Sequence, residues 1–535
     1  MICAFASLCT LAAEPTLDVQ AARHLLVRTG FGPTGAEVAA FTGLTRAAAV
    51  DRVLGTTRTE ALTPPPSWTT EPASLRPPGA PMVSEEDRKA FRQLQQRRTA
   101  ELRAWWVREM LNTTSPLTER MTLFWHNHFV SSQQKVRIAQ LMYRQNATFR
   151  RYALGNFRDL LHAAAKEPAM VIYLDAAQNR KAAPNENFAR EVMELFTLGE
   201  GHYSEQDIKQ AARAFTGWSI DRETGDFMFR AGVHDLGQKS VFGRSGDFDG
   251  DDVLDLLLAR PETSEFIVAK LWREFVSPTP QTQDVQRIAR AFRESGYDIK
   301  VAMRELLLCD AFWAPENRGA LVKSPAELVV GTLRSLDLSP VDTLPFAQAI
   351  AGMGQVLFAP PNVKGWPGGE AWINTDTLLA RKQYLARIGA LRPPSVPGDS
   401  IAAMSDVQRR AAAVESAVLR ARRQMPTSTT AMPISASRNG IDDDMPPLAA
   451  RMAREADARD RLEAALARGA RPLRFDASAW TQKLAGTSMV DKLANGEMLL
   501  LPLPAITADV GEARAQRDPA LVVRAALLDP VYELK

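Results

Sequence analysis

The stretch DVQAARHLLVRTGFGPTGAEVAAFTG, residues 18–43, shows the helical character of the chain. Its apolar residues recur at the three- and four-residue spacing of helices that bury one face. Gly30, Gly32 and Pro33 interrupt this pattern, and Thr34 is suited to cap a second helix. The stretch therefore predicts two helices joined by a tight turn.

The same spacing recurs to about residue 390, which extends the helical prediction to most of the chain. Clear examples are residues 99–113, 250–259, 263–276, 284–296 and 324–337. A segment over 187–198 is also expected to be helical and to stop at Gly199, because glycine tolerates positive φ. Residues 220–250 are rich in Gly and Phe and predict a hairpin. We expect a mainly α fold, an irregular multi-helix array with at most a small β-hairpin.

Changes in composition divide the chain into four parts. Residues 14–395 are expected to form a helical core domain. Residues 396–446 contain many Pro, Ser and Thr and predict a linker or mobile insertion with one helix. Residues 447–535 are expected to form a C-terminal helical segment that packs back on the core, and residues 1–13 could be part of an export signal.

The N-terminal stretch MICAFASLCTLAAEPTLD leaves two interpretations open. Its short apolar run and small residues before Glu14 are typical of an export signal, but no basic region precedes them. The alternative is an apolar N-terminal tail. Cleavage near Ala13 would leave Cys309 as the one remaining cysteine, so no disulfide framework is expected. The export interpretation predicts a periplasmic or extracellular location.

Charge and hydropathy exclude two classes of protein. The chain has 65 basic and 62 acidic residues and a formal net charge of +3. This balance argues against nucleic-acid binding, which usually requires a concentrated positive excess. No uninterrupted run of about 18 apolar residues occurs, so no integral membrane segment is expected.

Several strings together resemble one bacterial family, the proteins grouped as domain of unknown function 1800 (DUF1800). They include HLLVRTGFGPT (24–34), MTLFWHNHFVSS (121–132), NENFAREVMELFTLGEGHYSEQDI (185–208), HDLGQKSVFG (234–243), KLWREFV (270–276), APPNVKGWPGGEAWINTDTLLAR (359–381) and LLDPVYELK (527–535). The resemblance implies an exported, largely helical protein. It also implies a partner, a second exported protein encoded nearby, but it implies no reaction.

His126 and His128, in RMTLFWHNHFVSS, are the first candidates for chemistry. On a helix their side chains would point about 200° apart and could not share a ligand. On an extended segment they would share a face and suit a transition metal, for which imidazole is a common ligand. The alternative is structural: one ring packs beneath Trp125 and Phe129, and the other hydrogen-bonds to a helix end.

Glu191 and Glu194 are the second candidates, with Arg190 beside them. At helical spacing the two carboxylates lie on one face with Asn187, where they could bind a cation or act as a catalytic base with its orienting partner. The alternative is a salt-bridge network, in which Arg190 pairs with Glu186 or Glu194. Because apolar residues flank the glutamates, we predict that His126 or His128 lies within contact range of this face.

His202 and His234 complete a candidate metal site with His126 and His128. Both lie in Gly-containing loops, where a ring can approach a ligand closely. The alternatives are a turn residue for His202 and a locally hydrogen-bonded side chain for His234. A mixed His and carboxylate site would suit a divalent transition metal such as Zn, Fe or Mn. The cofactor is otherwise unknown.

Trp366 and Trp372, in the loop VKGWPGGEAWIN, permit either of two roles. Exposed rings could form a platform for a sugar or a peptide, whereas buried rings would anchor the loop to the core. At the level of the whole chain, two functions remain. The first is an exported metal-dependent enzyme with a His/Glu site, and the second is a noncatalytic helical scaffold or partner of another exported protein.

Overall fold

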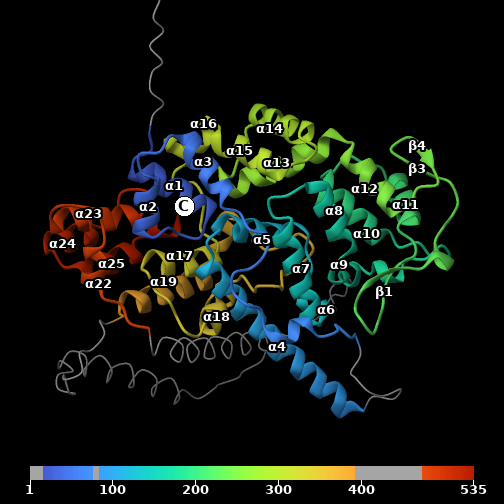
Figure 1. Cartoon of the computed structure of the whole chain (residues 1–535), viewed down its shortest axis with the longest axis horizontal. Helices are drawn as coiled ribbons and strands as arrows, with labels where there is room; N and C mark the ends of the chain where they lie inside the picture. The colour runs from blue at the N-terminus through green and yellow to red at the C-terminus, as the bar shows by residue number, and fades with distance from the viewer. Residues whose placement is uncertain (1–15, 76–83, 392–472) are drawn as a thin grey trace, which may run out of the picture. The chain divides into compact units, whose positions relative to one another are not determined.

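The computed structural model describes residues 16–75, 84–391 and 473–535. The predicted signal segment at 1–13, the linker at 396–446 and the first part of the C-terminal segment lie outside the described residues. The fold is mainly α, as the apolar spacing predicts (Figure 1).

The helices follow one another along the whole of the described chain. Those of the N-terminal part are α1 (Val19–Thr29), α2 (Gly35–Phe41), α3 (Arg46–Gly55), α4 (Glu85–Asn112), α5 (Pro116–His128), α6 (Gln133–Val136) and α7 (Ala139–Arg151). The central helices are α8 (Phe157–Lys166), α9 (Pro168–Tyr173), α10 (Glu186–Glu191), α11 (Glu205–Ala214), α12 (Gly250–Leu258), α13 (Pro261–Phe275), α14 (Thr282–Glu294), α15 (Ile299–Leu308) and α16 (Asp310–Trp313). The last are α17 (Pro325–Ser335), α18 (Leu344–Gly352), α19 (Thr375–Gly389), α22 (Ala477–Gln482), α23 (Met489–Leu500), α24 (Ala508–Ala515) and α25 (Pro519–Leu528).

Two small antiparallel sheets, rather than one hairpin, lie between α11 and α12. Strand β1 (Trp218–Ile220) pairs with β2 (Phe227–Phe229), and β3 (Lys239–Val241) pairs with β4 (Arg244–Gly246). The turn between β3 and β4 is two residues long, and both Phe242 and Gly243 have positive φ. This is the backbone that a tight two-residue hairpin requires.

Local side-chain caps set several helix starts. Thr34 caps α2 and forms a capping box with Glu37, as the stretch 18–43 predicts. Ser204 caps α11 in the same way with Asp207. These caps satisfy backbone N–H groups that a helix leaves without partners at its first turn.

Helix α5 lies in the middle of the core and contacts α1, α4 and α7. Pro116 starts this helix, and almost all its side chains are buried, the polar ones included. Burial on all sides requires each polar side chain to find a partner within the protein. Of the helices that follow residue 473, α23 packs on α1 and α2 at the beginning of the chain, and α25 packs on α19 (Figure 1).

Candidate functional site

His126 and His128 both lie on helix α5. The backbone here is helical and not extended, so the two rings point in different directions. The His126 ring is 1% exposed. Its Nε2 lies 3.1 Å from Asn146 Nδ2, and the rings of Trp106 and Phe149 pack against it. Burial, helped by the charge of Arg150, lowers the pKa of His126 to about 3. His126 is therefore a neutral core residue.

His128 points to a different group of residues. Its Nε2 lies 3.1 Å from the carbonyl oxygen of Phe196, and its Nδ1 lies 3.1 Å from Nζ of Lys270. Burial lowers the pKa of His128 well below its ordinary value, and the charge of Lys270 adds to this shift. A carbonyl can only accept, so Nε2 carries the proton and Nδ1 accepts from Lys270.

The carbonyls near His128 become available because the helix changes type. After α10 the chain continues as a π-helix over Val192–Thr197, in which Leu198 N–H donates to Met193 O at 2.8 Å. The chain leaves the helix at Gly199, where φ is +81°. Helices leave their last carbonyls without internal partners. Two of these carbonyls, on Leu195 and Phe196, accept from Lys270 and His128.

Lys270, on α13, is partly buried and has no carboxylate partner among the described residues. Its Nζ lies 3.1 Å from both Leu195 O and His128 Nδ1 and 4.7 Å from the centre of the Phe266 ring. Burial lowers the pKa of Lys270 to about 8, and the nearby charge of Arg273 contributes to this shift.

Lys270 and His128 line a cavity of about 410 Å³, which we call the Lys270 cleft. Its walls come from α5, α13, the start of α17 and the loop that contains VKGWPGG. The polar residues in the lining are Arg120, Asn127, His128, Lys270, Arg273, Glu274, Ser324, Glu327, Gln355, Lys364 and Lys535. Trp366 and Trp372 are part of the same wall.

Asn127 fastens the VKGWPGG loop to α5. The backbone N–H of Trp366 donates to Asn127 Oδ1 at 2.6 Å. Gly365 has φ of +92°, and a Cβ at this position would lie 2.2 Å from Asn127 Oδ1. Only glycine fits this approach without strain. Trp366 and Trp372 are 4% and 5% exposed, so both rings anchor the loop instead of forming an open platform.

A network of four charges, of which Arg120, Glu327 and Lys535 are buried and Glu274 is partly exposed, forms one end of the cleft. Arg120 pairs with Glu274 and, at 2.9 Å, with Glu327. Lys535 also donates to Glu327 and lies 3.7 Å from Glu274. The charges of Arg120 and Lys535 overcome the effect of burial and lower the pKa of Glu327 to about 2. Two cations and two anions balance within this network.

Three cations in the cleft form no ion pair among the described residues, although the charge of Lys364 acts on Glu191. Lys270, Arg273 and Lys364 line the cavity, and none forms an ion pair with a carboxylate in the described parts of the chain. Two buried N–H groups of the lining, Trp366 Nε1 and Arg120 Nε, have no hydrogen-bond partner among those residues. A buried donor without a partner costs about 1–3 kcal/mol. The cleft thus offers positive charge, whereas the two unpaired N–H groups are buried behind its surface.

Arg190 forms a salt-bridge network outside this cavity lining, but neither Glu191 nor Glu194 has an ion pair among the described residues. Arg190 donates to both carboxylate oxygens of Glu205 at 2.8 and 2.7 Å and lies 3.5 Å from Glu186. Glu194 accepts from the Tyr203 hydroxyl at 2.7 Å. Burial raises the pKa of Glu191, the charge of Glu194 raises it further, and Arg190 and Lys364 oppose the shift.

His202 and His234, the other two candidate metal ligands, each lie in a different environment. His234 is buried, and its Nδ1 lies 2.7 Å from Thr216 O, which matches the local hydrogen bond expected of a loop residue. His202 is exposed in the turn before α11. No hydrogen bond or ion pair in the described residues joins His126 or His128 to Glu191 or Glu194.

These positions do not assemble the metal site considered from the sequence. Over residues 16–75, 84–391 and 473–535, no group of three or more His, Cys, Asp or Glu side chains is placed to hold a metal ion. The physical reason is the helical backbone of α5, which sends its two rings in different directions. His128 reaches the Glu191–Glu194 segment through the backbone of Phe196 and not through a carboxylate.

Lys270, Arg273 and Asn127 are cleft residues that spacing does not single out. All three lie within the strings KLWREFV and MTLFWHNHFVSS. One sequence feature could have indicated that Lys270 is partly buried: this lysine directly precedes Leu271 and Trp272, both of which are buried. Its partner His128 is 142 residues away, and no local pattern predicts that contact.

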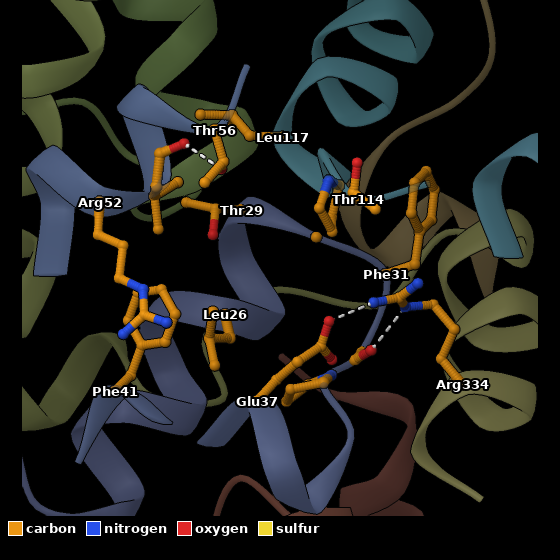
Figure 2. Close-up of a pocket in the computed structure, with 15 residues that line it drawn as sticks. Leu26, Thr29, Phe31, Glu37, Phe41, Arg52, Thr56, Thr114, Leu117 and Arg334 are labelled. Carbon is orange, nitrogen blue, oxygen red and sulfur yellow. Dashed lines mark hydrogen bonds and ion pairs between the residues drawn. The ribbon is translucent and has the colours of Figure 1, made fainter. Parts of the chain in front are cut away.

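A second, smaller cavity of about 170 Å³ lies beside the turn between α1 and α2 (Figure 2). Arg334 faces it but already donates to Gly32 O, Leu111 O and Glu37. Arg52 stacks on the Phe41 ring at its other side. Since the charged groups here have partners, this cavity is the weaker candidate for a ligand.

No helix of the described parts is long and apolar enough to cross a membrane. Comparisons with curated proteins and with solved structures gave no match. The family model described as "Protein of unknown function (DUF1800)" matches residues 24–480. This match covers well over half of the sequence and includes most strings that line the cleft, and the chain therefore belongs to the DUF1800 family.

Proposed function

We propose that the protein binds a small anionic molecule, one that contains a carboxylate or a phosphate, in the Lys270 cleft. One observation supports this most strongly: Lys270, Arg273 and Lys364 line a single cavity, and none of the three forms an ion pair with a carboxylate of the described residues. Carboxylates and phosphates are the groups that lysine and arginine bind by charge-assisted hydrogen bonds.

The metal-dependent enzyme expected from the sequence has less support than this proposal, because the four histidines lie in separate surroundings. The noncatalytic partner of another exported protein stays a prediction. Export and a periplasmic or extracellular location also stay predictions, because residues 1–13 lie outside the described parts of the chain.

Isothermal titration calorimetry with inorganic phosphate, citrate and glyoxylate tests anion binding at low salt. The variant Arg273→Gln/Lys364→Gln removes two exposed cations from the cleft. Each contributes about 1 kcal/mol, so the affinity should fall roughly thirtyfold. The matched control is Arg290→Gln/Lys300→Gln, which changes the net charge equally at two exposed positions on α14 and α15.

The control should bind like the wild type, and affinity for all variants should decrease as salt increases. An equal loss of affinity in both double variants would show that only the net charge of the protein matters, and it would refute anion binding in the Lys270 cleft. Absence of binding by the wild type to all three anions at millimolar concentration would refute the proposed function.

A further inference from the structure

We propose that Lys270 is a reactive amine that forms an imine with the carbonyl carbon of an anionic aldehyde or ketone. This inference rests on the proposed function, since the cations of the cleft would hold the anionic group of that compound. The first observation is the place of Lys270, which lines the cleft and has no carboxylate partner among the described residues.

The partners of Lys270 match a neutral amine as well as an ammonium. Its Nζ has two acceptors, Leu195 O and the Nδ1 of neutral His128. A neutral amine has two hydrogens, so it can donate to both acceptors and keep its lone pair free in the remaining tetrahedral direction. An ammonium would have the face of the Phe266 ring, and no oxygen or nitrogen acceptor of the described residues, for its third hydrogen, and no nearby acid there stabilises its charge.

The protein environment also makes the neutral form accessible. Burial lowers the pKa of Lys270 to about 8, with a contribution from Arg273. At pH 7 roughly a tenth of such an amine is neutral, against well under a thousandth of an ordinary lysine with its pKa near 10.4. Lysines activated by desolvation or by a neighbouring cation are known nucleophiles toward carbonyl compounds.

The reaction balances without a further reactant. The lone pair of Nζ attacks the carbonyl carbon and forms a C–N bond, which gives a carbinolamine. The two hydrogens of the amine leave with the carbonyl oxygen as water when the C–O bond breaks. The product is an imine, and no oxidant or reductant is needed. Arg273, one turn along α13 from Lys270, and Lys364 from the loop are placed to bind the anionic group.

Lys323 provides an internal comparison. Burial lowers its pKa to about 7, but its Nζ donates to Tyr532 O at 2.6 Å and lies 3.8 Å from the centre of the Tyr532 ring. It does not line the Lys270 cleft. If a lowered pKa alone made a lysine reactive, Lys323 would react as well as Lys270.

The test uses the full chain, glyoxylate as a small anionic aldehyde, and acetaldehyde as a neutral one. Sodium cyanoborohydride traps imines as stable secondary amines, and peptide mass spectrometry locates them. We expect glyoxylate at pH 7 to label Lys270 at least about tenfold faster than the mean of the other lysines. The rate should increase with pH and level off above pH 8, and Lys323 should stay unlabelled.

The variants separate this inference from the proposed function. Arg273→Gln/Lys364→Gln should slow glyoxylate labelling of Lys270 but not acetaldehyde labelling, whereas Arg290→Gln/Lys300→Gln should change neither. If calorimetry shows anion binding but Lys270 reacts no faster than other lysines, the imine is refuted and the proposed function stands. If Lys270 reacts equally fast with both aldehydes, the role of the cleft cations in placing the carbonyl is refuted.

Discussion

Replacing Gly365 by alanine tests how the VKGWPGG loop is held against α5. The new Cβ would lie 2.2 Å from Asn127 Oδ1 and 2.8 Å from Asn127 O. Alanine at φ of +92° costs roughly 1–2 kcal/mol in backbone strain. The close contact with backbone and side chain adds roughly 1–3 kcal/mol. The free energy of unfolding should therefore fall by about 2–5 kcal/mol.

The loop can relieve this strain by leaving its place, which limits the loss of stability but releases Trp366 N–H from Asn127 Oδ1. Either response moves Lys364 and Trp366, so the affinity for phosphate should fall about tenfold or more. Urea denaturation gives the stability and calorimetry gives the affinity. Gly43→Ala is the matched control, because φ there is +87°, nothing lies within 4 Å of a Cβ and the residue is outside the cleft lining; it should show the backbone strain alone and bind phosphate like the wild type. Wild-type stability and affinity in Gly365→Ala would show that the close approach of Gly365 to Asn127 does not hold the loop in place.

Three further predictions concern buried charges. Glu327→Gln removes the buried carboxylate that pairs with Arg120 and Lys535. The free energy of unfolding, measured by urea denaturation, should fall by about 3–5 kcal/mol. A loss under about 1 kcal/mol would contradict a stabilising role of this ion-pair network. Burial raises the pKa of Glu167 from 4.5 to about 7, because the folded protein favours the protonated carboxyl. Its contribution to stability is therefore fully present below pH 4.5 and is lost as the pH rises through 7. Glu167→Gln should stabilise the protein by about 3 kcal/mol at pH 8 and by much less at pH 5, as thermal unfolding at both values can show; equal differences at the two values would contradict this. The folded pKa of His126 is about 3, so the protein should lose stability as pH falls below 6.5, by about 2.7 kcal/mol at pH 4.5 from this residue. Because Glu167 shifts stability the opposite way over this range, the test compares variants: the loss between pH 6.5 and 4.5 should be smaller in His126→Gln than in the wild type, and equal losses would disagree with a neutral, buried His126.

Local structure follows from the sequence where the cause is itself local. Apolar spacing predicts the helices, Thr34 and Ser204 are recognisable as caps, and Gly199 is recognisable as a helix end. The π-helix at Val192–Thr197 is not predicted, because its one-residue change of register leaves the apolar pattern almost unaltered. The composition of segment 220–250 indicates β structure, but it does not indicate the division into two hairpins.

The candidate site is harder to predict because its contacts join distant segments. The pair His126 and His128 fits both a metal site and a helix, and only the backbone of α5 decides between them. Lys270 owes its lowered pKa to burial between α13 and the end of the π-helix, 75 residues away along the chain. Apolar periodicity places each helix face toward a core but does not indicate which other helix it meets.

The four-charge network has a consequence for the order in which the chain folds during synthesis. Arg120, Glu274 and Glu327 are all made long before Lys535, which lies 208 residues after Glu327. Until Lys535 arrives, Glu274 and Glu327 have Arg120 as their ion-pair partner and the buried guanidinium of Arg28 nearby, and Glu327 lacks one of the two cations that lower its pKa. The ribosome-bound chain therefore has an electrostatic reason to keep this end of the cleft open. Final closure should be a late event that depends on residues 529–535, with the β-bridge between Val322 and Leu534 forming at the same stage.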